Sequence, residues 1–227
     1  AINTTATEYL DIDATAAGRI YLNETDGVIV TAVDSADGLI SILTGGDTLL
    51  THVESDTDAD ANDISVIASA GDITIADAGV NAGAAGDVVI EATAGAIDDA
   101  QANVNTTTDI TGDVVTLTSL DGVGGTADID TTAATLDVSV TAAGAIVLNE
   151  SDGVDLSDID TFNGPITITT GGATTVTDVT SLTDADANDI TITVTAGDVE
   201  VDTLNAGATA GDEDDFIFES HIRLPNF

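Results

Sequence analysis

Residues 15–27 have the sequence TAAGRIYLNETDG, and residues 141–153 have the sequence TAAGAIVLNESDG. The two segments lie 126 positions apart, and the same offset continues without a gap, so that residues 15–78 match residues 141–204 at roughly half of their positions. A long self-similarity at one fixed offset is typical of repeat proteins, in which equivalent units stack on one another. The sequence therefore predicts a stacked structure.

Within each copy, aliphatic residues recur at a spacing of two, as in the pairs Ile20/Leu22 and Ile40/Ile42, with Thr, Ser, Asp or Glu often between them. Alternation of this kind with β-branched residues predicts short strands with one buried face. Gly or Gly-Asp precedes many of these strands and supplies the abrupt turns between them. No stretch shows the 3.6-residue period of a helix, so we expect an all-β protein.

Two architectures fit strands that begin every 8 to 15 residues or so: a sandwich of Greek-key domains and a parallel β-helix. The chain has only six aromatic residues, fewer than a sandwich core usually requires, and its apolar residues are mostly small aliphatics. We therefore predict a parallel β-helix, or β-solenoid. With coils of about 20–25 residues, the chain would form about nine to eleven coils, and the 126-residue unit would contain five or six of them.

The predicted domain organisation is a continuous β-solenoid over residues 1–212 and an atypical segment over residues 213–227. This last segment carries three of the four Phe residues, and most of it has no counterpart in the repeat. A solenoid must cover its terminal coil to prevent open-ended strand pairing. Residues 213–227 are therefore expected to form either a C-terminal cap or a strand that docks onto the next subunit.

The charge is extreme: 42 acidic residues stand against two basic ones, Arg19 and Arg223, which gives a formal net charge of −40. Nucleic-acid binding needs a basic surface, so no nucleic-acid partner is expected. No apolar run approaches the ~18 residues of a membrane span, so no membrane insertion is expected. Self-repulsion must be screened by salt or neutralised by divalent cations, which leaves two explanations: adaptation to high salt, or calcium binding.

The best chemical candidate is an acidic loop that is retained in both copies of the repeat. Carboxylate and amide oxygens at alternate positions of a loop can converge on Ca²⁺, which takes six to eight oxygen ligands. A solvated acidic turn is the competing interpretation, and the loop lacks the glycine and distal glutamate of an EF-hand. The predicted calcium ligands are Asp56, Asp58, Asp60, Asn62, Asp63, Asp184, Asp186, Asn188 and Asp189.

A second acidic segment, residues 23–27, recurs as residues 149–153 and has the sequence NETDG in the first copy and NESDG in the second. A tight turn between two strands explains this segment better than a metal site. Catalysis finds little support, because the chain has no GxSxG, HExxH or P-loop motif. We therefore expect no enzyme, with a carbohydrate-binding or carbohydrate-cleaving β-helix as the alternative.

Three segments carry a resemblance to a known family: GDITI at residues 71–75, AGDVVIEATAGAI at 85–97 and TAAGAIVLNESDGV at 141–154. They resemble the β-helical repeats of filamentous-haemagglutinin-like and autotransporter-type surface proteins. The resemblance implies a secreted, right-handed β-helix that serves as a stalk, adhesin or extracellular fibre at the cell surface or in the extracellular matrix. It also implies partners of the same kind, either further copies or neighbouring repeats of a longer chain, together with surface glycans, and no catalytic residues.

Overall fold

The computed structural model describes residues 2–4, 9–101, 107–183, 185, 187–207 and 217–220, with the backbone alone for the first and last of these ranges. These residues form 21 strands and no helix. Every pairing between the strands is parallel. The strands stack into a β-solenoid of about nine turns, which confirms the predicted parallel β-helix.

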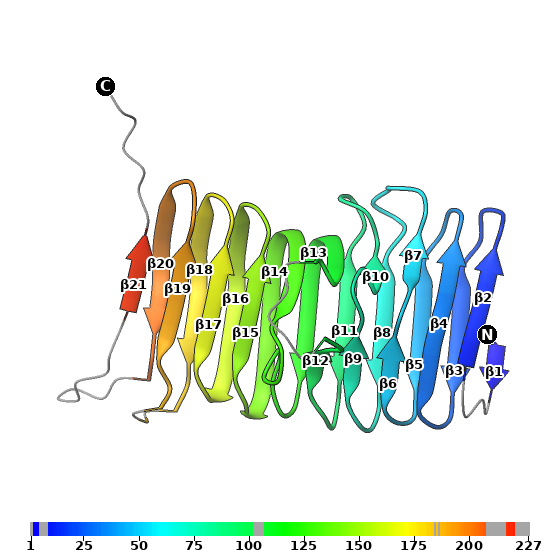
Figure 1. The fold of residues 1–227 in the computed structure, drawn as a ribbon, viewed down its shortest axis with the longest axis horizontal. Coiled ribbons are helices and arrows are strands. Elements are labelled where there is room, and N and C mark those ends of the chain that lie inside the picture. The colour runs from blue at the N-terminus through cyan, green and yellow to red at the C-terminus, as the bar shows by residue number, and fades with distance from the viewer. Residues whose placement is uncertain are drawn as a thin grey trace.

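The strands stack along the long axis of the molecule in two ladders, here called the first and the second face (Figure 1). The first face contains β1 (Ile2–Thr4), β3 (Ile20–Glu24), β5 (Ile40–Thr44), β8 (Ile64–Ala68), β11 (Val88–Ala92), β13 (Ile110–Ser119), β14 (Ile129–Ala143), β16 (Val154–Asn163), β18 (Thr174–Ser181) and β20 (Val199–Asn205). The second face contains β2 (Tyr9–Ala14), β4 (Val28–Ser35), β6 (Thr48–Leu50), β7 (Val53–Ser55), β9 (Ile73–Ile75), β10 (Val80–Asn81), β12 (Ile97–Asp99), β15 (Ile146–Glu150), β17 (Ile166–Thr170), β19 (Ile190–Val194) and β21 (Ile217–Ser220).

Alternate residues of most strands point into the space between the two faces, as the spacing of two predicts. In β8, for example, Ile64, Val66 and Ala68 are fully buried, whereas the residues between them are partly exposed. The interior is almost entirely aliphatic, and one continuous cluster of buried residues extends from Leu10 to Val194. Burial of these side chains is the main favourable term for the fold.

Several buried hydroxyl groups at the corners of the coils donate to backbone carbonyls. Ser35 Oγ donates to the carbonyl oxygen of Gly18 at 3.0 Å, and its repeat counterpart Thr161 donates to that of Gly144 at 2.9 Å. Ser181 Oγ donates in the same way to the carbonyl oxygen of Gly164. These bonds satisfy polar groups that would otherwise be buried without a partner, and their repetition shows that both copies form the same coil corner.

The two copies of the repeat place their equivalent residues on opposite faces. On the first face, one ladder of paired residues passes through Ile20, Ile40, Ile64, Val88, Val115, Leu136 and Leu156. On the second face, another ladder passes through Val28, Thr48, Ile73, Ile97, Val123 and Ile146. Ile146 is the repeat counterpart of Ile20, yet it belongs to the ladder that contains Val28.

The 126-residue unit therefore spans five and a half coils, within the five or six that the sequence predicts. Five coils take the chain from Ile20 to Leu136, and the remaining ten residues carry it across to Ile146 on the second face. The strands β13 and β14 lie at this changeover, since β13 pairs with both β10 and β11, and β14 pairs with both β15 and β16. On the second face, the ladder there narrows to single bridges at Val123.

At the C-terminal end, β21 lies within the predicted atypical segment and pairs with β19, which extends the second face by one strand. The other residues of the segment 213–227 lie outside the described residues. Its role as a cap or as a subunit junction stays a prediction, as does the right-handed coil.

Glycines in the turns allow successive coils to approach closely. A Cβ atom on Gly45 would lie 1.9 Å from the carbonyl oxygen of Thr25, and one on its counterpart Gly171 would lie 2.0 Å from that of Ser151. Because these neighbours are backbone atoms of the preceding coil, the clash could be relieved only by separating the coils.

We expect Gly45→Ala and Gly171→Ala each to lower the free energy of unfolding by about 1–3 kcal/mol, because overpacking of this kind forces the backbone to shift. Gly125→Ala is the matched control, since a Cβ atom there would meet nothing within 4 Å. Chemical denaturation of the three variants measures the effect. Equal stabilities of the turn variants and the control would contradict the close-stacking explanation.

Candidate functional site

The two predicted calcium loops lie at opposite edges of the solenoid. The first loop leads from β7 on the second face to β8 on the first face, whereas the second leads from β18 on the first face to β19 on the second. This follows from the half coil that separates the two copies. The two loops therefore cannot combine their carboxylates in one cation site.

Several of the predicted ligands in the first loop contact the neighbouring coil. Asp58 Oδ1 accepts a hydrogen bond from the backbone N–H of Ala85 at 2.7 Å, and Asp63 Oδ1 accepts one from that of Asp87 at 3.2 Å. Asp56 and Asp60 are exposed to solvent. These contacts join consecutive coils and leave other carboxylate oxygens available.

In the second loop, Asp189 is exposed, and Asp184 and Asp186 lie outside the described residues. Two groups of three His, Cys, Asp or Glu side chains within the described ranges have ligand atoms that all lie within 4.8 Å of one another, and neither contains a residue of the two acidic loops. Calcium binding at these loops stays a prediction.

The two loop asparagines share a structural contact that the sequence did not reveal. Asn62 is buried, and its Nδ2 donates to Asp37 Oδ1 at 3.0 Å and to the carbonyl oxygen of Thr57 at 2.8 Å. Asn188, its counterpart, donates to Asn163 Oδ1 and to the carbonyl oxygen of Thr183. The amide thus closes the loop on itself and ties it to the preceding coil.

The variant Asn62→Asp separates this structural role from a role in calcium binding. A carboxylate cannot donate to Asp37 and Thr57, so we expect the free energy of unfolding to fall by about 2–3 kcal/mol. A calcium ligand would instead tolerate the change or bind calcium more tightly. Thermal melts with and without calcium measure the effect, and Asp60→Asn in the exposed part of the loop is the control. An unchanged melting temperature would contradict the closing role.

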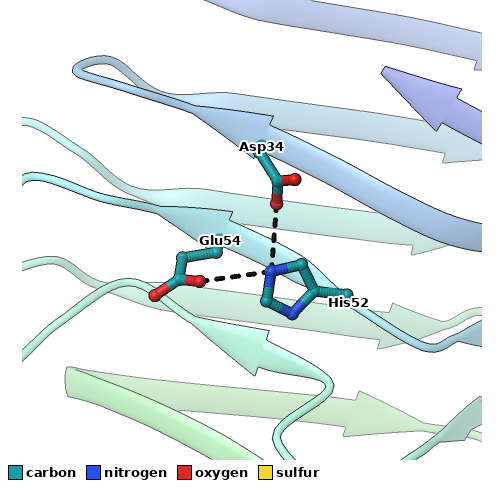
Figure 2. Close-up of side chains that lie close together, drawn as sticks. All are labelled: Asp34, His52 and Glu54. Carbon is teal, nitrogen blue, oxygen red and sulfur yellow. Dashed lines mark ion pairs between the residues drawn. The ribbon is translucent and has the colours of Figure 1, made fainter. Parts of the chain in front are cut away.

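A second cluster involves His52, which sits between two carboxylates on the outer surface of the second face (Figure 2). His52 Nε2 lies 3.1 Å from Asp34 Oδ1 and 3.2 Å from Glu54 Oε2. The ladder brings these carboxylates together, since Asp34 in β4 pairs with Glu54 in β7. Asn81, next in the ladder, donates to Glu54 Oε1 at 2.8 Å and fixes that side chain.

Burial and the neighbouring charge act on the pKa of Asp34 in opposite directions. Burial raises the pKa of the Asp34 carboxyl, and the neighbouring His52 opposes that rise. One imidazole nitrogen and two carboxylate oxygens form a donor set that Zn²⁺ accepts. The same contacts also suit an ion pair between a protonated imidazole and two carboxylates, which at a partly exposed site contributes at most about 1 kcal/mol.

The cluster is specific to the first copy of the repeat. The counterparts of Asp34, His52 and Glu54 are Asp160, Asp178 and Thr180, so the second copy has no imidazole at this place. There, Thr180 Oγ1 donates to Asp178 at 2.8 Å, and burial followed by neighbouring carboxylates raises the pKa of Asp160. The signal in the sequence was a histidine that interrupts the repeat, but it did not identify the partners.

Exchanging the counterparts tests the charge balance of the cluster. We expect His52→Asp to lower the free energy of unfolding by about 0.5–1 kcal/mol, because three carboxylates then lie together. We expect Asp178→His to raise it by a similar amount, because the imidazole gains the Asp160 carboxylate. Thermal melts at low salt measure both effects, which should shrink in 1 M NaCl. Changes of the same sign in both variants would rule out this explanation.

Residues 25–26 and 151–152 form bends directly after β3 and β15, as the turn interpretation of segments 23–27 and 149–153 predicts. Glu24 and its counterpart Glu150 are buried there, and Glu24 Oε1 accepts from the backbone N–H of Thr25 at 2.9 Å. Glu150 Oε2 accepts from Thr131 Oγ1 at 2.7 Å. Burial raises the pKa of Glu150 to about 7 in spite of these bonds. In the second copy, the Glu150 carboxylate therefore stabilises the turn by accepting hydrogen bonds, although burial disfavours its ionised form.

The fold defines a class, an all-β parallel solenoid with an acidic surface. Comparison with protein-family models, curated proteins and solved structures found no match to the chain. Within the described ranges, no helix is long and apolar enough to cross a membrane.

Proposed function

We propose that the protein is a structural module of a secreted or cell-surface filament or adhesin, in which stiff β-solenoid rods join end to end. The stack of parallel strands supports the stiff rod, because backbone hydrogen bonds between strands join each coil to the next. The repeat supports the same role, since it adds length and surface by duplication rather than by building a single pocket.

The observation that carries the proposal is that aliphatic side chains in the terminal coils are more exposed than their repeat counterparts inside the rod. Val201 in β20 is 43% exposed, whereas its repeat counterpart Ile75 is fully buried inside the rod. At the other end, Ile12 in β2 is only partly buried, whereas its counterpart Val138 is fully buried. Both ends thus present positions that become buried when another coil stacks on them.

The occupant that fits these ends is another coil of the same kind. It belongs either to a second copy of the protein or to the next repeat of a longer chain. Parallel strands with unpaired edge groups are templates for further pairing. Side-by-side association is opposed by the net charge of −40. End-to-end docking would extend the backbone ladder and cover aliphatic side chains such as Val201 and Ile12. Calcium in the surroundings would reduce the remaining repulsion.

Analytical ultracentrifugation and electron microscopy at high protein concentration with millimolar calcium test the proposal. We expect linear oligomers, and we expect Val201→Asp to reduce the apparent association constant at least tenfold, because it places a charge at the docking edge. Val89→Asp is the matched control, since Val89 has a similar exposure of 39% on β11, away from the ends. A wild-type protein that stays monomeric would refute self-assembly, and a monomer that degrades a polysaccharide would favour the carbohydrate-cleaving alternative.

A further inference from the structure

A cluster of aspartates lies at the end of the first copy of the repeat and in the segment that joins it to the second copy. Asp77 follows β9, Asp99 ends β12, and Asp109 precedes β13, and one carboxylate oxygen from each lies within 4.8 Å of the other two. Asp130 in β14 joins them, because its backbone N–H donates to Asp109 Oδ2 at 2.9 Å. Asp128 lies two residues before Asp130 and interacts electrostatically with both Asp99 and Asp130.

The core of this cluster is buried, and several of its oxygens lack donors. Asp109 is fully buried, and Asp130 is only 3% exposed. Asp109 Oδ1, Asp130 Oδ2 and Asp128 Oδ1 are buried oxygens with no hydrogen-bond donor among the residues that the structure describes. Nor does any basic side chain in the described ranges form an ion pair with them. A buried carboxylate without a donor or a counter-charge is strongly disfavoured.

The pKa values of the buried aspartates also show that their ionised forms are disfavoured without a partner. Burial, reinforced by the neighbouring carboxylates, raises the pKa of Asp109 to about 8 and that of Asp130 to about 6, although each accepts one hydrogen bond. Groups of this kind must bind either protons or a cation. Asp77 is exposed, and Asp130 lines a surface groove of about 260 Å³, so two members of the cluster border solvent.

We propose that Asp77, Asp99, Asp109, Asp128 and Asp130 form a binding site for one Ca²⁺ ion. Every donor is an oxygen, with no imidazole or thiolate, which is the donor set of a hard cation. Five carboxylates can supply most of the six to eight oxygens that Ca²⁺ takes, and water can supply the rest. The oxygens of Asp109, Asp128 and Asp130 that lack a hydrogen-bond donor would then be bound to the calcium ion.

The position of the site gives the ion a structural role. The cluster draws residues from the ends of β9, β12, β13 and β14, where the chain makes its additional half coil. On the second face, only single bridges at Val123 connect β12 to β15 in this region. An ion held by side chains beside these four strands would join coils that the second face connects there only through single bridges. The inference does not depend on end-to-end assembly.

Calorimetric titration and thermal melts of the wild-type protein at pH 7.5, first in EDTA and then in calcium, test the site. At free calcium one hundred times the dissociation constant, we expect the melting temperature to rise by about 5–10 °C. Asp109→Asn should remove most of this rise and one bound ion per chain. It should also melt no lower than the wild type in EDTA, because the amide is uncharged and its oxygen can still accept from the backbone N–H of Asp130. Asp130→Asn serves as the second variant if Asp109→Asn does not fold.

Asp60→Asn in the first acidic loop is the control, and it should keep the full calcium-induced rise in melting temperature and the bound ion of the cluster. The proposal is overturned if both cluster variants retain the wild-type shift and stoichiometry. It is also overturned if the wild-type protein neither binds calcium nor melts at a higher temperature in its presence, which would mean that protons alone neutralise the cluster. Loss of the calcium response in Asp60→Asn, with the cluster variants unaffected, would assign calcium to the loop.

Discussion

The structure depends on the parallel ladder of backbone hydrogen bonds that joins each coil to the next. Side chains in a strand alternate between the two sides, so a shift of one residue would turn every buried aliphatic group outward. The ladder therefore holds its register along most strands, for example over the five residues that pair β8 with β11, and shifts it only locally in the β2–β4 and β14–β16 pairings among the described strands. Differences in coil length are absorbed in the turns, where the close approach of Gly45 to Thr25 keeps the coils in contact.

This constraint explains how much of the fold could be predicted. The alternation in segments such as Ile40/Ile42 predicts strands with one buried side, and the scarcity of large apolar residues favours a solenoid over a sandwich. The half coil could not be predicted, because the 126-residue offset shows which residues are equivalent but not which face they occupy. That assignment requires the length of every coil, and the segment between the copies, which contains β13 and the first half of β14, has no repeat to align.

Some of the candidate sites could be found in the sequence, whereas others appear only when the coil register is known. The acidic loops were visible because the repeat retained them, yet the buried amides of Asn62 and Asn188 close the loops, which the sequence did not indicate. The cluster of Asp34, His52 and Glu54 depends on the pairing of β4 with β7, so it becomes visible only when the coil register is known. The aspartates between the copies are brought together by irregular segments, and no periodicity could have grouped them.

The buried acids show why the joining segment differs from the repeat itself. In the repeated turns, Glu24 and Glu150 are buried, but backbone N–H groups of the same turn point at their carboxylates. When such a turn is duplicated, the backbone N–H groups that donate to the carboxylate are duplicated with it. Asp109 and Asp130 lie where the chain crosses from one face to the other, and their available donors leave one oxygen of each without a partner. A buried negative charge without donors requires a partner from outside the chain, and on a surface as acidic as this one the partner must be a cation or a proton.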